Sequence, residues 1–584
     1  MNRKERRVAH KHDRPADARR TKSAGDQIHQ LFSEAAAYEQ ARKFNDAARA
    51  YKRVLQLEPD HAQACNNLGR VMQALGKPRE ASACFARALA LMPQLLEQQY
   101  AGICATLVAL CPPLGGALQQ QAAAWPKRLT ENELFGNAGL ASIAADPLLL
   151  CLLQSIQVRD VAFERLLTAL RLSLLADATS GKPIPDTVVA FGCALAKQCF
   201  INEYVFATTA EEDANLDRLK NTVADALASG PSIAPMRIAV LAMYLPLHAL
   251  SSAAKLLERQ WIPAIEDVLT QQLREPAREQ QLRDTIPRLT SIEDEVSRRV
   301  QRQYEESPYP RWVNAAGQVQ AIPIDQYLRE QFPDRGFAAL GKTEVLEVLV
   351  AGCGTGQIAI ASAQKYLGAR VLAFDLSISS LCYARRNTPP ALAARIEYAQ
   401  ADVLEVASID RRFDVIDASG VLHHMADPLE GWRILLTLLR PAGFMHLGLY
   451  SETGRSDVVA ARAFIAERGF GSTPADIRRC RQELLAMSLA SVTRFTDFFS
   501  TSECRDLLFH VQESRLTIPR IKAFLTQNNL RFLGFEFDAA KASRYRELFA
   551  EQGWSASDLD HWHDLETKHA DTFSGMYQFW VQKG

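Results

Sequence analysis

Residues 345–357 read VLEVLVAGCGTGQ, a short apolar run that leads directly into a turn containing Gly352, Gly354 and Gly356. Because glycine has no Cβ, such a turn can bend sharply and let the backbone approach a bound nucleoside closely. The dinucleotide fingerprint GxGxxG would need a third glycine at position 357, and that residue is Gln357. The turn therefore indicates a nucleotide site of some kind and argues against NAD.

Downstream of this turn, short apolar segments alternate with helical ones. This alternation predicts a parallel sheet wound with helices on both faces. In such a fold, ligands bind outside the carboxyl ends of the strands. The expected strands after the glycine turn are RVLAFD (370–375), RIEYAQAD (395–402), FDVIDAS (413–419) and FMHLGLY (444–450).

Two carboxylates stand at the ends of these predicted strands. Asp375 lies nineteen residues after Gly356, where an acidic side chain can accept both hydroxyls of a ribose. Asp402 ends the next strand, where a carboxylate can accept the exocyclic amine of adenine. Either one alone would be an ordinary strand-end carboxylate. Together, in this order and at these spacings, they resemble the class I S-adenosylmethionine-dependent methyltransferases.

This resemblance implies a Rossmann-like α/β core of seven strands over residues 341–584, with a helical insertion at about 451–525 above the active-site edge. The last two strands, 530–537 and 573–581, would form an antiparallel hairpin. The residues implied to bind S-adenosylmethionine are Gly352, Gly354, Gly356, Asp375, Leu376, Asp402, Val403 and Ser419. One departure is Val350, because many family members carry an acidic residue there, so the contacts to the methionine ammonium must differ.

Methyl transfer from a sulfonium depends mainly on alignment, so a catalytic base is optional. The base candidates are His423 and His424, just past the fourth strand, because imidazole titrates near neutrality. Tyr450 and Glu452 form a second pair that could face the acceptor. An equally weighted alternative is that one histidine packs while the other orients the loop. The loop 419–422 lacks the Asn/Asp-Pro-Pro-Tyr/Phe signature of amide and base-amine methylation, and loosely resembles members that act on carbon or oxygen.

Residues 301–340 are expected to connect a helical region to the core. Within them, 303–312 read QYEESPYPRW, whose prolines and aromatic residues make a stiff segment. We expect Tyr304, Tyr309 and Arg311 to line a lid over the cofactor, with Arg311 near the methionine carboxylate. A packed linker between domains is the alternative.

Residues 26–95 contain an internal repeat of 34 residues that resembles the tetratricopeptide pattern. Two repeats cannot bury their own faces, so residues 94–110 are expected to add a capping helix. Such arrays bind a protein or peptide partner in a groove, and a docking or dimerising helical cap is the alternative. The repeat matches Ala35, Tyr38, Ala47, Tyr51 and Pro59 to Gly69, Met72, Ala81, Phe85 and Pro93.

Residues 96–300 are helix-rich and are expected to form an all-α scaffold domain. The acidic run 211–213 is interpreted as a helix start, because no further ligands for a metal lie nearby, and no metal site is predicted. The eleven cysteines form no CxxC pair, which indicates reduced thiols in a cytoplasmic protein. The longest uncharged stretches contain prolines and are interpreted as buried helices, so no membrane span is expected.

The formal net charge of zero hides an asymmetry, since residues 1–22 contain nine Lys/Arg and three Asp/Glu and carry +6. The rest of the chain therefore carries −6. Residues 1–25 are predicted to be a basic, disordered tail. Contact with RNA is expected only through this tail, and a solvated leader is the favoured alternative.

The order of these parts resembles a bacterial group of large methyltransferases fused to N-terminal tetratricopeptide repeats. Four further blocks carry the resemblance: QCFINEY (198–204), QYEESPYPRW (303–312), ECRDLLFHVQE (503–513) and GMYQFW (575–580). The third block could add Arg505, Asp506 or His510 to the acceptor pocket, although an amphipathic helix is the favoured alternative. The resemblance implies methyl transfer to an unidentified acceptor, either a docked protein or peptide or a small molecule. The competing hypothesis is a cofactor-sensing repeat scaffold without turnover.

Overall fold

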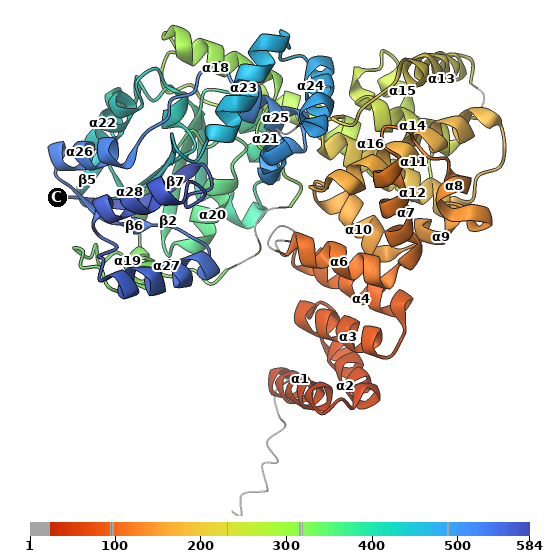
Figure 1. The fold of residues 1–584 in the computed structure, drawn as a ribbon, viewed down its shortest axis with the longest axis horizontal. Helices are drawn as coiled ribbons and strands as arrows, with labels where there is room; N and C mark the ends of the chain where they lie inside the picture. The colour runs from red at the N-terminus through yellow and green to blue at the C-terminus, as the bar shows by residue number, and fades with distance from the viewer. Residues whose placement is uncertain are drawn as a thin grey trace, which may run out of the picture. The chain divides into compact units, whose positions relative to one another are not determined.

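The computed structural model describes residues 24–93, 95, 99–230, 232–314, 317, 319–487 and 490–584. Most of the predicted basic tail lies outside these residues. The chain divides into two compact units, each described by itself below. Unit 1 comprises residues 24–92, 102–111 and 146–148, and unit 2 comprises the other described residues. The predicted methyltransferase core belongs to unit 2, and so does the predicted scaffold apart from residues 102–111 and 146–148 (Figure 1).

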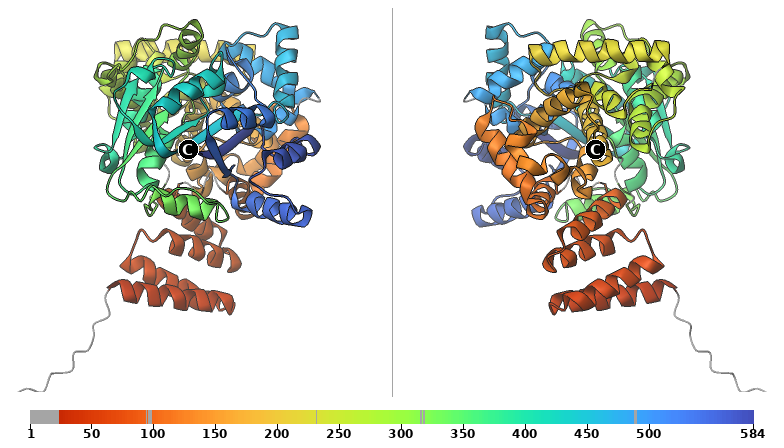
Figure 2. Two further views of the ribbon diagram at one scale, coloured as in Figure 1. Left: turned by 90° about the vertical axis from the view of Figure 1, so that its left-hand side faces the viewer. Right: turned by 90° about the vertical axis from the view of Figure 1, so that its right-hand side faces the viewer.

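Unit 1 is built from successive helix pairs, as the repeat predicts (Figure 2). A Cβ on Gly69 would lie only 2.8 Å from the ring of Phe85, so the glycine lets two helices cross closely. Tyr51 is fully buried and its hydroxyl donates to Glu39 Oε2 at 2.9 Å. The helices are α1 (Ala24–Gln40), α2 (Phe44–Leu57), α3 (Ala62–Ala74) and α4 (Pro78–Leu91), followed by α6 (Tyr100–Leu110) within the range expected for the cap.

The first part of unit 2 is helical. Thr209 caps the N-terminus of α13 through a capping box with Glu212, so the acidic run 211–213 begins a helix as interpreted. A π-helical turn, Thr270–Arg274, joins two helices further on. The helices are α7 (Pro112–Ala124), α8 (Glu131–Phe135), α9 (Ala141–Ala144), α10 (Pro147–Ser155), α11 (Val161–Ser180), α12 (Asp186–Ile201), α13 (Ala210–Ser229), α14 (Pro235–Tyr244), α15 (Ala253–Leu257), α16 (Pro263–Leu269), α17 (Glu275–Leu282) and α18 (Glu295–Glu306).

A seven-stranded sheet follows, in the order β3-β2-β1-β4-β5-β7-β6, which confirms the predicted Rossmann-like core. The first five strands are parallel, and β7 pairs antiparallel with both β5 and β6. The last two strands pair as predicted, but α27 (Ala539–Gln552) and α28 (Leu559–Lys568) lie between them in the chain. The strands are β1 (Leu346–Ala351), β2 (Ala369–Asp375), β3 (Ile396–Gln400), β4 (Phe413–Ser419), β5 (Leu439–Tyr450), β6 (Leu530–Phe535) and β7 (Met576–Lys583).

Alternate residues of the strands enter two cores, one on each face of the sheet. Val348 and Val350 belong to the core formed with α19 (Ile324–Gln331), α20 (Gln357–Lys365) and α21 (Ile378–Asn387). Leu349 and Ala351 belong to the core formed with α22 (Pro428–Leu438), α26 (Ile518–Gln527) and α28. The segment between β5 and α26 has a third core of its own, built by α23 (Ser456–Arg468), α24 (Pro474–Ala486) and α25 (Thr501–Phe509).

All eleven cysteines carry free thiols. Among the described residues, no single helix is long and apolar enough to cross a membrane, and only the bent pair α6 and α7 meets the length and composition requirement together.

Candidate functional site

A cavity of about 320 Å³ lies at the carboxyl ends of β1, β2 and β4, where ligands bind in doubly wound folds. It has a largely apolar lining with a few polar groups, as expected of a cofactor site. The structure brings seven of the eight residues predicted from the resemblance to its wall: Gly352, Gly354, Asp375, Leu376, Asp402, Val403 and Ser419. The wall of the cavity also includes Tyr304, Tyr309, His424, Met425, Met576 and Gln578.

The glycine turn has a left-handed backbone, with φ of +49° at Gly354 and +90° at Gly356. A Cβ at Gly354 would lie 2.7 Å from the carbonyl oxygen of Tyr309, so the turn can lie beneath that residue only as glycine. Gly356 is absent from the cavity wall, and its role as a binding residue stays a prediction. It precedes α20, and a Cβ there would lie 2.6 Å from the Cβ of Ala384, so the glycine allows close packing between helices.

Asp375 ends β2 with both carboxylate oxygens engaged by backbone. Its Oδ2 accepts from the Gly354 amide at 2.8 Å and its Oδ1 accepts from the Ser377 amide at 2.9 Å. These bonds fix the orientation of the carboxylate. Burial nevertheless raises the pKa of Asp375 to about 6, because the backbone donors offset only part of the lost hydration. Further donors, such as two ribose hydroxyls, would stabilise the ionised form.

Asp402 lies two residues beyond the end of β3 and is buried. Its Oδ1 accepts from the Leu404 amide at 3.0 Å, whereas its Oδ2 is buried without a hydrogen-bond partner. Burial raises the pKa of this carboxyl, and the nearby Ser297 hydroxyl offsets part of the rise without reaching hydrogen-bonding geometry at Oδ2. An unpaired buried acceptor costs roughly 1–3 kcal/mol. The exocyclic amine of an adenine would remove that cost, so the residues present fit an adenosine-containing cofactor.

Residues 304–312, here called the strap, cover the glycine turn. The Thr355 hydroxyl donates to the carbonyl of Pro310, and the indole N–H of Trp312 donates to both the carbonyl and the hydroxyl oxygen of Thr355 at 3.1 Å. At the other end of the strap, the Ser377 hydroxyl donates to the carbonyl of Tyr304 at 3.0 Å. The strap is thus hydrogen-bonded to the two turns that would contact a cofactor, and Tyr304 and Tyr309 line the cavity as predicted.

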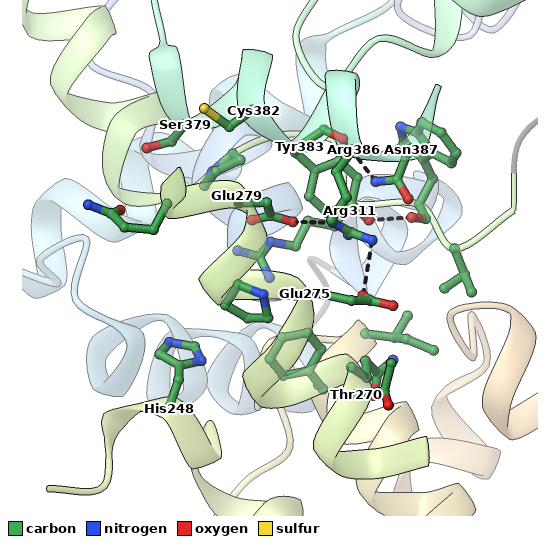
Figure 3. A pocket seen from close by; sticks show the side chains of 18 of the residues that line it. His248, Thr270, Glu275, Glu279, Arg311, Ser379, Cys382, Tyr383, Arg386 and Asn387 are labelled. Atoms are coloured by element: carbon green, nitrogen blue, oxygen red, sulfur yellow. Dashed lines mark hydrogen bonds and ion pairs between the residues drawn. The ribbon is translucent and has the colours of Figure 1, made fainter. Parts of the chain in front are cut away.

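Arg311 does not line this cavity, so the structure does not bring it to the other predicted cofactor residues. Its side chain lines a second cavity of about 390 Å³, shown in Figure 3, between α17, α21 and the strap. Its Nε lies 3.3 Å from Glu203 Oε1, and its guanidinium carbon lies 5.9 Å from the ring centre of Tyr383. The partly buried guanidinium of Arg311 thus has a carboxylate partner, Glu203, outside the cofactor cavity.

Of the three predicted catalytic residues, only His424 reaches the cavity. Its Nδ1 lies 3.0 Å from the carbonyl oxygen of Gln512. His423 is 1% exposed and stacks on Tyr450 with ring centres 3.5 Å apart, and the Arg455 guanidinium lies 3.6 Å from the centre of the Tyr450 ring. His423 and Tyr450 therefore pack behind His424 and do not line the cavity, and their catalytic role stays a prediction.

Residues 503–513, the third sequence block, place two side chains beside the cavity, although an amphipathic helix was the favoured interpretation. Asp506 and His510 are both buried, and the Tyr304 hydroxyl donates to Asp506 Oδ1 at 2.5 Å. His424, Asp506 and His510 place three potential metal-ligand atoms within 4.8 Å of one another, a group that sequence spacing did not predict. Arg505 does not join this group, because it pairs with Glu306 at 2.8 Å.

Three of the four blocks that carried the resemblance meet at the strap. Glu203, from the first block, contacts Arg311 and accepts from the Ser502 amide at 2.6 Å. Gln303 accepts from the amide of Val511, in the third block, at 3.2 Å. Segments about 100 and 200 residues from the strap in sequence thus hold it over the cavity. The spacing within each block gave no signal of this contact.

Two family models match the chain. Residues 348–443 match a model described as a methyltransferase domain, and residues 38–107 match one described as a tetratricopeptide repeat. With the seven-stranded fold, these matches define the second part of the chain as a class I methyltransferase domain. The chain thus joins a methyltransferase domain to tetratricopeptide repeats that precede it.

Curated relatives align with part of the chain. An uncharacterized protein of Synechococcus sp. is 28% identical over 267 residues, which are 42% of this chain and 61% of the relative. A ubiquinone biosynthesis O-methyltransferase of Leptothrix cholodnii is 32% identical over 123 residues, which are 21% of this chain and 51% of the relative. The chain thus spans between half and two thirds of the length of these relatives.

Solved structures align more loosely. PKMT2 from Rickettsia typhi in complex with AdoHcy is 16% identical, with a TM-score of 0.35 and coverage of 44% of this chain and 52% of that one. Magnesium protoporphyrin IX methyltransferase from Synechocystis with bound SAM is 12% identical, with a TM-score of 0.27 and coverage of 50% and 100%.

Proposed function

We propose that this chain is an S-adenosylmethionine-dependent methyltransferase. The observation that carries the proposal is Asp402, whose buried Oδ2 has no hydrogen-bond partner and lines the same cavity as Asp375. A buried carboxylate oxygen that no protein group pairs with needs a donor from outside the chain, and an adenine amine bound in this cavity would be such a donor. We assign Asp402 and Val403 to the adenine, Asp375 to the ribose hydroxyls, and Gly352 and Gly354 to the methionine part of the cofactor. When bound, the cofactor supplies an electrophilic methyl group on a sulfonium sulfur.

An oxygen acceptor is the class that the site supports best. His424 is the base candidate that lines the cavity, and a hydroxyl must lose a proton when it is methylated. The partial relatives named as ubiquinone biosynthesis O-methyltransferases act on oxygen according to their names. The residues of the cavity would suit either a small molecule or a protein side chain as the acceptor. The tetratricopeptide repeats would favour a protein or peptide acceptor by docking it.

Isothermal titration calorimetry with S-adenosylmethionine and with S-adenosylhomocysteine tests the cofactor site. Replacing Asp402 with alanine removes a charged acceptor, a loss of roughly 1.5–3 kcal/mol, and should weaken binding by about 10- to 150-fold. Asp410→Ala is the matched control, because Asp410 is an exposed carboxylate in the same loop. Equal affinities for the wild type and Asp402→Ala would remove the basis of the assignment.

Turnover needs a separate experiment. The protein should be incubated with cofactor labelled in its methyl group and with host lysate, and the lysate then divided into protein, RNA and small-molecule fractions. Label should appear in the small-molecule or the protein fraction. Tight cofactor binding without label in any fraction would favour the alternative of a cofactor-sensing scaffold, and label in RNA would direct attention to the basic tail.

A further inference from the structure

Four side chains meet where the cofactor cavity adjoins the segment inserted between β5 and α26, and are here called the histidine cluster: the partly buried Tyr304 and the buried His424, Asp506 and His510. The rings of His424 and His510 stack with centres 3.7 Å apart. The Nε2 atom of each ring lies 4.0 Å from Asp506 Oδ1. Tyr304 and His424 line the cavity, whereas Asp506 and His510 lie behind them.

The backbone of Gln512 determines which nitrogen of each ring carries hydrogen. The carbonyl of Gln512 lies 3.0 Å from His424 Nδ1 and can only accept, so His424 carries its hydrogen on Nδ1. The amide of the same residue donates to His510 Nδ1 at 3.0 Å, so His510 carries its hydrogen on Nε2. One residue thus holds the two stacked rings in opposite tautomers. His424 Nε2 is left with a free lone pair.

This hydrogen-bond pattern does not match that of a metal site. A cation would need lone pairs on both Nε2 atoms, and metal-bound histidines donate their other ring hydrogen to an acceptor. His424 meets that requirement, but His510 accepts a hydrogen bond at Nδ1. Its Nε2 lies 3.2 Å from the Tyr304 hydroxyl oxygen, and that hydroxyl donates to Asp506. The bonds run from His510 through Tyr304 to the carboxylate, which is the direction of a proton network.

We propose that His424 and Asp506 form a catalytic dyad that takes the proton from a neutral hydroxyl acceptor. His424 is the catalytic base, and Asp506 is a positioning residue. This inference rests on the proposed methyltransferase function. In the step it serves, a lone pair of the hydroxyl oxygen forms the new oxygen–methyl bond, and the methyl–sulfur electron pair remains on sulfur. The hydroxyl proton moves to His424 Nε2, and the imidazolium faces the carboxylate of Asp506.

The charges around His424 leave Asp506 as the carboxylate available for this role. Glu513 is already engaged, because it accepts two hydrogen bonds of 3.2 and 2.9 Å from Arg455 and also pairs with Arg462 and Arg515. Among the described residues, no arginine or lysine nitrogen lies within 4.0 Å of Asp506. Burial lowers the pKa of His424, and Asp506 opposes that shift, as do the Gln512 carbonyl and Glu513, while Arg455 adds to it. The uncharged groups facing the ring are His423, Tyr450, Tyr304 and His510.

Nitrogen-15 NMR of protein labelled at histidine reports the tautomer and the pKa of each ring without any need for turnover. His424→Gln and His510→Gln serve to assign the signals. We expect the Nδ1–H tautomer at His424 and the Nε2–H tautomer at His510. Asp506→Asn keeps an acceptor for the Tyr304 hydroxyl but removes the charge, so the pKa of His424 should fall by roughly 1–3 units. Arg505→Gln, on the same helix but paired outward with Glu306, should leave it unchanged.

A second variant covers the case in which Asp506→Asn does not fold. Tyr304→Phe removes the donor that shares the Asp506 charge, so the pKa of His424 should rise. Identical tautomers in the two rings, or an unchanged pKa of His424 in the variant that folds, would overturn the dyad. Stoichiometric shifts of both rings on adding Zn²⁺ would show a cation site instead.

The labelled products from lysate test the acceptor class. A methylated hydroxyl is an ether and keeps its label in mild alkali, whereas a methylated carboxylate, which needs no base, releases labelled methanol. We expect alkali-stable label. Calorimetry with S-adenosylhomocysteine separates failure of the proposed methyltransferase function from failure of the proposed dyad. A wild type that does not bind it contradicts the methyltransferase function, while normal binding with alkali-labile label contradicts only the dyad.

Discussion

Replacing Gly354 with alanine should weaken cofactor binding by loosening the strap. Two effects are expected at this residue. Its φ of +49° costs a residue with a Cβ roughly 1–2 kcal/mol, and the new Cβ would lie 2.7 Å from the carbonyl oxygen of Tyr309. Ordinary contact begins near 3.4 Å, so the strap must move by several tenths of an ångström. That shift strains the bonds from Thr355 to Pro310 and from Trp312 to Thr355.

The backbone strain and the contact can be separated. At roughly 0.5–1.5 kcal/mol for each hydrogen bond, losing one or two of them is worth about 1–3 kcal/mol. If the cofactor must restore the strap in order to bind, calorimetry with S-adenosylhomocysteine should show affinity lower by about 5- to 150-fold. Gly341→Ala is the control, because Gly341 has a φ of +64° with open space around it and is absent from the cavity wall. It should cost stability but not affinity. Wild-type affinity in Gly354→Ala would refute the account of the strap as part of the binding site.

Three further predictions follow from other groups. Burial raises the folded-state pKa of Asp375 from 3.8 to about 6, so its stability contribution falls as pH rises between those values. Because ribose hydroxyls would favour the ionised form, affinity for S-adenosylhomocysteine should rise from pH 5 to pH 7, and Asp375→Asn should abolish that rise in calorimetry. Arg311→Ala should leave cofactor affinity within about twofold while lowering the free energy of unfolding in denaturant titrations, because Glu203 loses its partner. Arg481→Met should destabilise by roughly 3–5 kcal/mol in the same titrations, since it leaves Glu164 buried without its cation, and a second change of Glu164 to leucine should restore most of that loss.

The sheet could be predicted because its signals are local. Each strand is a short apolar run, and each residue assigned to the cofactor stands at or just after the end of its own strand. The parallel order of the strands was therefore enough to predict where Asp375 and Asp402 lie. The register of the sheet then places both carboxylates at one edge, beside the glycine turn. The presence of seven strands followed from the same pattern with the resemblance, whereas the two helices between β6 and β7 had no signal in the strand motif.

The acceptor side could not be predicted in the same way, because its partners come from distant segments. Arg311 and Tyr309 lie two residues apart in the strap, yet Tyr309 lines the cofactor cavity and Arg311 lines another. What decides between the two positions is Glu203, about 100 residues earlier. Likewise, nothing around His423 and His424 indicates which imidazole faces the ligand. The contact with Gln512 that orients His424 comes from the inserted segment.

The cofactor side and the acceptor side of the cavity come from different parts of the chain. The residues assigned to the cofactor lie in the turns that follow β1, β2 and β3, whereas Asp506, His510 and Gln512 lie in or just after α25, in the inserted segment. The cofactor site and the proton network meet at the cavity wall and in the strap, where the Tyr304 hydroxyl donates to Asp506 and the Tyr304 carbonyl accepts from Ser377. Changes in the insertion that spare Asp506 can therefore alter the acceptor without moving Asp375 or Asp402. The base itself belongs to the core, but its tautomer is determined by the insertion through Gln512. In the proposed mechanism, His424 is therefore the residue at which the cofactor site and the acceptor site meet.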